Sequence, residues 1–170
     1  MNAAARRTAA LTAVLLLALG ACAGRRLVDG VYHAPSGYRV TVPGPAWEVA
    51  ADSRADLELR HRTAPAGMVA NAVCDPAVAR RDWDVLGLHL LIGMRDRAML
   101  EANEAPVNGR VASHRLLEGR MQQTDERVRV ESYTLKGDRC VYDLLYVAPP
   151  EAFDAWRGDF ERFVQSFTGE

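Results

Sequence analysis

The chain has 170 residues, a length that suits one domain with a single hydrophobic core once a targeting segment is removed. Its 21 basic and 22 acidic residues nearly balance, and the formal net charge of -1 provides no bulk attraction for nucleic acid. Length and charge therefore predict a single globular domain that does not bind nucleic acid.

The first 21 residues are organised like a secretory signal. Arg6 and Arg7 precede an apolar run from Ala9 to Leu19 that only Thr12 interrupts. The run is too short for a transmembrane helix, because the ~30 Å hydrocarbon core requires about 20 apolar residues. We therefore expect export, with plain secretion or a membrane-spanning anchor as the alternatives to a lipid anchor.

The end of this segment, Leu-Gly-Ala-Cys from Leu19 to Cys22, resembles the lipobox of bacterial lipoproteins. In that family the cysteine receives a diacylglycerol on sulfur, the chain is cut before it, and the new amino terminus is acylated. The resemblance implies a signal peptide at 1–21, an acylated tether at 22–30 and a domain at 31–168. Since Ala23 does not match the aspartate of an inner-membrane retention signal, we expect the periplasmic face of the outer membrane.

The two remaining cysteines, Cys74 and Cys140, form an even pair in a compartment that permits disulfides. Each one lies at the end of an apolar segment that resembles a strand. We predict a disulfide between neighbouring strands, closing a loop that would stabilise the fold by ~4 kcal/mol. Two buried free thiols are the alternative.

The first half of the predicted domain contains four short segments with the pattern of strands. In the first, Tyr38, Val40 and Val42 alternate with polar residues before a Gly-Pro turn. The four segments are 37–43, 47–49, 57–61 and 67–74. Four strands in succession predict an antiparallel meander.

After Asp75-Pro76 the apolar period lengthens from two to nearly four, which predicts a helix from Asp82 to about Leu100. One apolar face contains Trp83, Leu86, Leu90, Met94 and Ala98. A second apolar patch, a possible binding surface, contains Val85, Leu88, Ile92 and Met99. Such a helix is either covered on both sides by the fold or leaves a groove for a lipid or partner.

Residues 101–106 are predicted to form a polar loop, and three long strands follow at 107–121, 127–135 and 140–147. A Lys-Gly-Asp turn at 136–138 makes the last two strands a clear hairpin. The strand after Cys140 is apolar on both faces apart from Asp143, so we expect it to be central. Asp143 would then need a partner such as Arg115 or Arg129.

A closing helix is predicted to begin at Pro149-Pro150-Glu151, where proline is favoured. Its apolar residues recur at intervals of three and four and are mainly aromatic. They are Phe153, Trp156, Phe160, Phe163, Val164 and Phe167. This stripe predicts a helix that packs flat on the sheet and supplies much of the core.

The order of elements, together with the Gly37–Pro43 strand, Trp47 and the terminal helix running into Ser166-Phe167, resembles the PsbP-like fold. That fold is shared by a photosystem extrinsic subunit and by bacterial lipoproteins. The resemblance implies an α+β domain, an antiparallel sheet of six or seven strands between helices. Because the family is mostly accessory, it also implies a non-catalytic role.

The sequence contains no catalytic or metal motif: His33, His61, His89 and His114 lack metal-ligand spacing, and there is no nucleophile elbow or phosphate-binding glycine loop. We expect no cofactor. Three functions remain as hypotheses. The first is an accessory module that docks on another envelope protein, the second is a carrier of a hydrophobic ligand, and the third is an enzyme that gathers Asp143, a histidine and arginines.

Overall fold

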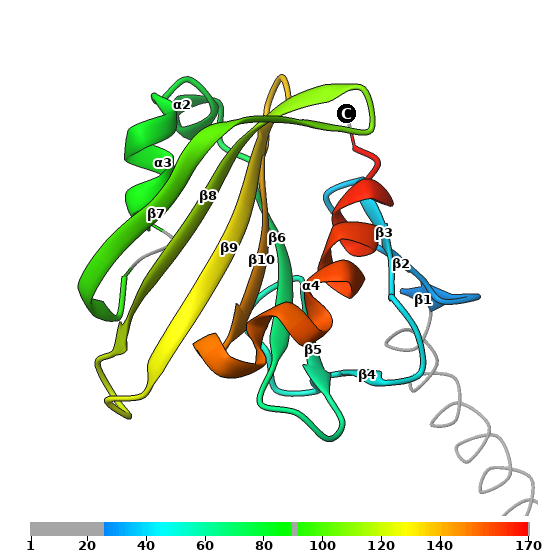
Figure 1. The fold of residues 1–170 in the computed structure, drawn as a ribbon. Coiled ribbons are helices and arrows are strands. Elements are labelled where there is room, and N and C mark those ends of the chain that lie inside the picture. Colours follow the sequence, from blue (N-terminus) through cyan, green and yellow to red (C-terminus); the bar gives the residue numbers. More distant parts are fainter. Residues whose placement is uncertain (1–25, 90–91, 170) are drawn as a thin grey trace, which may run out of the picture.

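The computed structural model describes residues 26–89 and 92–169, and the strands in this part of the chain form two antiparallel sheets (Figure 1). The strands are β1 (Leu27–Val28), β2 (Val31–His33), β3 (Arg39–Thr41), β4 (Trp47–Val49), β5 (Leu57–His61), β6 (Gly67–Val73), β7 (Met94–Val107), β8 (Arg110–Met121), β9 (Arg127–Lys136) and β10 (Val141–Ala148). The helices are α2 (Pro76–Ala79), α3 (Trp83–His89) and α4 (Pro150–Gln165).

The larger sheet has the strand order β4-β5-β6-β10-β9-β8-β7, and the smaller one has the order β1-β2-β3. The predicted α+β class, with an antiparallel sheet flanked by helices, is confirmed. Strand β10 occupies the middle of the larger sheet, as its apolar character on both faces indicated.

Helix α4 covers one face of the larger sheet with the predicted aromatic stripe (Figure 1). Phe153 and Phe160 are fully buried and pack on Tyr146 of β10, with ring centroids 4.8 and 5.5 Å from the tyrosine ring. The Tyr146 hydroxyl donates a hydrogen bond to the Phe153 carbonyl oxygen at 2.9 Å. Because aromatic burial stabilises by ~25 cal/mol per Å², α4 anchors the main core.

The opposite face of the sheet meets α2 and α3 at one end only (Figure 1). Arg115 of β8 donates hydrogen bonds to the Trp83 carbonyl oxygen at 3.1 Å and to the Asp84 carboxylate at 2.8 Å. The Lys136 ammonium lies 4.4 Å from the centre of the Trp83 ring, a cation–π contact. These contacts hold α3 over one end of β8 and β9 and leave the other end uncovered.

The smaller sheet corrects the prediction of a single four-stranded meander. Of the four predicted strands, only those that correspond to β4, β5 and β6 are neighbours in the larger sheet, whereas β3 pairs with β2. The smaller sheet is held to the end of the chain by a bridge between Arg39 and Thr168 and by stacking of Tyr38 on Phe167. Strand β1, Leu27–Val28, lies within the segment 22–30 that was predicted to be a tether, so the folded part of the chain includes these two residues.

The predicted helix over 82–100 is wrong in its second half, where β7 begins at Met94. Gly93 has a φ of 94°, a left-handed conformation that glycine adopts readily and that interrupts helices. Beyond it the backbone pairs with β8, Met94 opposite Met121 and Met99 opposite Leu117. Hydrogen bonds to the sheet edge therefore override a local pattern that suits either structure.

The predicted loop at 101–106 is also wrong, since these residues continue β7. They are polar because β7 is an edge strand whose side chains are mostly exposed. The actual turn is Asn108-Gly109, with φ values of 45° and 80°. Asn-Gly is a favoured hairpin turn, so this dipeptide is the signal that could have located the hairpin.

Candidate functional site

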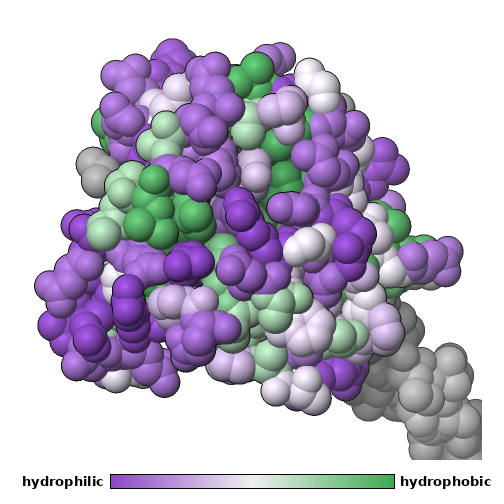
Figure 2. All heavy atoms as spheres, viewed as in Figure 1, coloured by the Kyte–Doolittle hydropathy of each residue, from purple (hydrophilic) through white to green (hydrophobic). Residues whose placement is uncertain are grey.

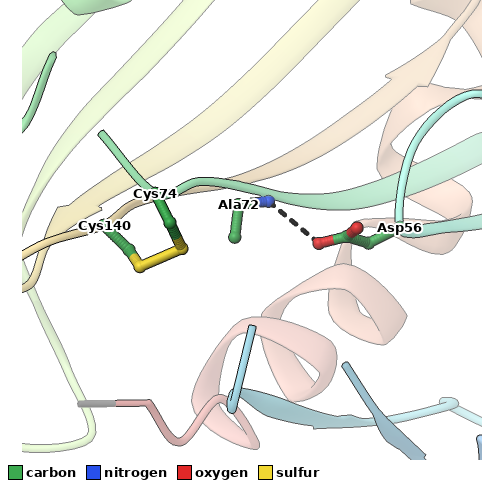
Figure 3. The surroundings of a disulfide bond; sticks show 4 residues. All are labelled: Asp56, Ala72, Cys74 and Cys140. Carbon is green, nitrogen blue, oxygen red and sulfur yellow. Dashed lines mark hydrogen bonds between the residues drawn. A yellow bond between two sulfur atoms is a disulfide. The ribbon is translucent and has the colours of Figure 1, made fainter. Parts of the chain in front are cut away.

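The lipidation site predicted at Cys22 lies outside the described residues and stays a prediction. Cys74 and Cys140 form the predicted disulfide, with an S–S distance of 2.08 Å (Figure 3). It continues the ladder of β6 and β10 one position past the pair Val73–Val141. Beside it the Asp56 carboxylate accepts a hydrogen bond from the Ala72 amide at 3.1 Å (Figure 3). Covalent and polar contacts thus close this end of the central strands.

The predicted binding surface is not one helical face. Val85 and Leu88 lie in α3, Ile92 lies in the following turn, and Met99 lies in β7. The exposed fractions are 39% for Val85, 80% for Ile92 and 49% for Met99. Figure 2 shows a hydrophobic patch over β7 and β8, and β7 carries the half-exposed Met99 and Leu100. Val85, Ile92 and Met99 are thus exposed, but they come from a helix, a turn and a strand and do not form one helical face.

A space of about 140 Å³ lies between α3 and the sheet, where the carrier hypothesis would place a hydrophobic ligand. A Cβ atom on Gly87 would lie 1.8 Å from the Arg115 guanidinium, so α3 lies directly on that side chain. Small-molecule pockets occupy ~300–1,000 Å³. The space is lined by Val73, Val78, Arg81, Leu86, Val141 and Asp143. It is too small for a lipid chain.

A buried polar cluster lies between α4 and the β7, β8 and β9 strands. Glu131 of β9 is fully buried, and its Oε1 atom lies 2.9 Å from His114 Nε2. Arg157 of α4 donates to both carboxylate oxygens, from Nε to Oε2 at 2.9 Å and from Nη2 to Oε1 at 3.0 Å. His114 Nδ1 lies 2.8 Å from Asn103 Oδ1. One carboxylate thus links three strands and the helix.

The electrostatics of the cluster keep Glu131 ionised. Burial alone would raise the pKa of Glu131, but the hydrogen bonds from His114 and Arg157 outweigh it, and the pKa is lowered. The bond to Glu131 raises the pKa of Arg157 against the effect of burial. Burial, with the Glu131 charge adding to it, raises the pKa of Tyr133 to about 12. A carboxylate only accepts hydrogen bonds, so His114 Nε2 carries the proton between them.

This cluster differs from the constellation that the enzyme hypothesis requires. Asp143 projects from the face of β10 opposite α4 and accepts a hydrogen bond from the Thr134 hydroxyl at 2.8 Å. The partners expected for it bind other carboxylates, because Arg115 pairs with Asp84 and Arg129 with Glu118. The structure gathers His114 and an arginine around Glu131 instead.

A second buried histidine, His61, lies between two tryptophans. Its ring centroid is 5.1 Å from that of Trp47 and 3.9 Å from that of Trp156. His61 Nδ1 accepts a hydrogen bond from the Ala64 amide at 3.0 Å. Within residues 26–89 and 92–169, no three or more His, Cys, Asp or Glu side chains are arranged to hold a metal ion. The two ring contacts place His61 in the packing between β4 and α4.

The described part of the chain also contains an open groove of about 680 Å³. It opens at the end of the sheet drawn lowest in Figure 1, between the β5–β6 and β8–β9 connections, on the face that α2 and α3 cover at its other end. Its floor is formed by Gly67, Met121, Val128 and Val147. Gly67 pairs with Val147 across β6 and β10, and its missing side chain deepens the groove there.

Charged residues surround this apolar floor. The rim contains Glu58, Arg60, Glu126, Arg127 and Glu151. An open apolar floor with a polar rim is the arrangement of a binding surface for a protein or small molecule. We call the surface formed by these floor and rim residues the sheet groove.

Comparisons with known proteins show what the fold is similar to. No protein-family model matches the sequence, and no match is found among curated proteins. Among solved structures, the cyanobacterial PsbP protein (CyanoP) of Synechocystis matches with a TM-score of 0.57 and 13% identity, over 90% of this chain and 99% of CyanoP. The fold is PsbP-like.

Two further solved structures are similar to this chain in fold. A protein from Bacteroides thetaiotaomicron matches with a TM-score of 0.58 and 8% identity, over 83% of this chain and 48% of that one. PA94, a Pseudomonas aeruginosa protein of unknown function described as a putative regulator, matches with a TM-score of 0.50 and 7% identity, over 82% and 96%. At these identities the likeness concerns the fold alone.

Within this PsbP-like fold, sequence reasoning missed both the Glu131 cluster and the sheet groove. Glu131 shares its side of the strand pattern with Arg127 and Arg129, opposite Val128 and Val130, so no local signal indicates that it is buried. The groove residues come from separate elements that no local spacing connects.

In the described part of the chain, no helix combines the length and the apolar character needed to cross a membrane.

Proposed function

We propose that this protein is a non-catalytic accessory module of the cell envelope that docks on another envelope protein. A lipid on Cys22 would tether it to the periplasmic face of the outer membrane, with cleavage after residue 21. The main support for docking is the sheet groove, an open depression of about 680 Å³ with an apolar floor.

The polar residues in the interior support a non-catalytic role. Both oxygens of the Glu131 carboxylate are used by His114 and Arg157, so the cluster offers no free base or nucleophile. The carboxylate instead joins strands to α4. The groove, in contrast, is rimmed by exposed side chains that can meet a partner.

The lipid anchor is tested in the native bacterium by labelling with palmitate. We expect the wild-type protein to incorporate the label and fractionate with membranes, and Cys22→Ala to do neither. An unlabelled wild-type protein, or a membrane-bound Cys22→Ala protein, would remove the anchor from the proposal.

Docking is tested separately with a photoreactive amino acid placed at Val147 in the groove and, as a matched control, at Val111. Val111 is an exposed valine at the opposite end of β8, with 58% of its surface accessible. At native expression levels, position 147 should crosslink stoichiometrically to one envelope protein and position 111 should not. Equal crosslinking at both positions would contradict docking through the groove.

A carrier of a small hydrophobic ligand is the second candidate, favoured by the volume of the groove, which lies within the range of ligand pockets. Native mass spectrometry of the full-length protein released from detergent distinguishes the two. A copurifying small molecule that is lost when Val147 becomes Asp would support the carrier; a clean protein mass would favour docking.

A further inference from the structure

The sheet groove has a charge pattern that defines the chemistry of its partner. Its two arginines are already paired: Arg60 lies 2.9 Å from Glu58, and Arg127 lies 2.5 Å from Glu118. Each arginine is therefore held by a neighbouring carboxylate, although Glu118 is shared between Arg127 and Arg129. The rim itself has three carboxylates, Glu58, Glu126 and Glu151, against these two arginines.

Two carboxylates of the rim have no such partner. Glu126 lies in the β8–β9 connection and Glu151 lies in the first turn of α4, and both are exposed. No ion pair between residues of the described ranges involves either one. They border an apolar floor, so the groove as a whole presents hydrophobic surface between negative charges.

Resting on the docking function proposed above, we infer that the sheet groove binds a segment of a partner protein in which an apolar side chain is flanked by basic side chains. The apolar side chain would lie on Val147 and Val128, in the depression beside Gly67. The basic side chains would pair with Glu126 and Glu151. An acyl chain with an anionic headgroup fits less well, because the same carboxylates would repel the headgroup.

Gly67 provides a variant that fills the groove without disturbing the fold. A Cβ atom there would meet only the Leu59 carbonyl oxygen at 3.5 Å, an ordinary contact. Because Gly67 pairs with Val147 and Arg60, its new side chain would project onto the groove floor. Gly67→Val should therefore fold normally, which thermal unfolding checks, and should lose binding.

The chemistry is tested by selecting from a random display library of short peptides on the full-length protein in detergent. We expect peptides with apolar residues between lysines or arginines. In fluorescence anisotropy, these peptides should bind Gly67→Val and Val147→Asp at least ~10-fold more weakly than wild type, and Val111→Asp with unchanged affinity.

Charge reversal makes the second arm of the test. The double variant Glu126→Lys/Glu151→Lys should bind the basic peptides at least ~10-fold more weakly and should select acidic peptides from the library. The control Glu104→Lys, an exposed change on β7, should alter neither the affinity nor the selection. Acidic or uncharged peptides that still need Gly67 would overturn the inferred chemistry while docking at the groove stands. The inference would be overturned if no peptide is selected, or if the selected peptides bind Gly67→Val as tightly as wild type. The crosslinking experiment tests docking independently of this result.

Discussion

Arg157 on α4 donates a hydrogen bond to Glu131 on β9 across 2.9 Å, and through it a partly exposed helical residue neutralises a fully buried carboxylate. Ionised groups are retained in protein interiors when they are paired and hydrogen-bonded. The pair therefore fixes the position of α4 over the sheet, in addition to the aromatic stripe.

Replacing Arg157 with alanine should destabilise the protein by about 2–3 kcal/mol. Breaking a buried ion pair costs ~3–5 kcal/mol, and we expect less because His114 still donates a hydrogen bond to Glu131 and Arg157 is 35% exposed. Arg162→Ala on the same helix is the control: its ion pair with Asp159 is at the surface, so the loss should be below ~1 kcal/mol. Urea unfolding measures both, and equal losses would contradict a structural role for the buried pair.

The lowered pKa of Glu131 predicts a dependence of stability on pH. Its folded pKa lies below the value of about 4.3 in unfolded chains, so its stabilisation is present above that value and is lost as pH falls through the folded pKa. Glu131→Gln should be less stable than wild type at pH 7. The difference should shrink below about pH 4, where protonated Glu131 resembles glutamine.

The same comparison separates Glu131 from other carboxyls. Glu118 also has a lowered pKa, caused by hydrogen bonds from Arg129 and Arg127. Because Glu118 is present in both the wild type and Glu131→Gln, its contribution to the pH dependence cancels in the difference between them. Unfolding free energies at pH 7 and pH 3 provide the measurement. A difference that stays constant with pH would show that Glu131 contributes through shape and not through charge.

The disulfide between Cys74 and Cys140 should stabilise the fold by about 4 kcal/mol, because it closes a loop spanning 66 positions in the unfolded chain. Cys74→Ser, Cys140→Ser and the double variant should all lose a similar amount. Unfolding of the wild type in reducing buffer should reproduce that loss. Clearly additive losses in the double variant would mean that the cysteines act independently.

Gly87→Ala should have the opposite effect from the same change in an ordinary helix. Alanine normally stabilises a helix by ~1 kcal/mol relative to glycine, but here its Cβ would lie 1.8 Å from the Arg115 guanidinium. The displaced arginine would lose its bonds to Trp83 and Asp84, so we expect a net loss of about 1 kcal/mol.

A double-mutant cycle checks this interpretation. In an Arg115→Ala background the clash is absent, so Gly87→Ala should become stabilising by up to ~1 kcal/mol. The same sign in both backgrounds would contradict the direct contact between α3 and Arg115.

Several parts of the fold could be read from local pattern. The alternation around Val128 and Val130 indicated a strand, and the apolar residues after Cys140 indicated the central strand of the sheet. The aromatic spacing from Phe153 onward indicated a helix on that sheet. These signals succeeded because side-chain direction repeats every two residues in strands and every three to four in helices.

Other parts depended on contacts between distant residues. Residues 94–107 suit a helix or a strand by themselves, and the free hydrogen-bonding edge of β8 decided between them. The groove likewise required Gly67, Glu126, Val147 and Glu151 to come together from separate elements.

The sequence by itself determined the class of fold, the central strand and the closing helix, because each follows from a local hydrophobic period. It also determined the pairing of the two cysteines, because only two remain once Cys22 is assigned to the lipobox. Only the tertiary structure decided which polar residue is buried, where α3 ends and where the surface is open. Burial of Glu131 depends on Arg157, which lies 26 positions away in the chain, and no short-range pattern records that pairing.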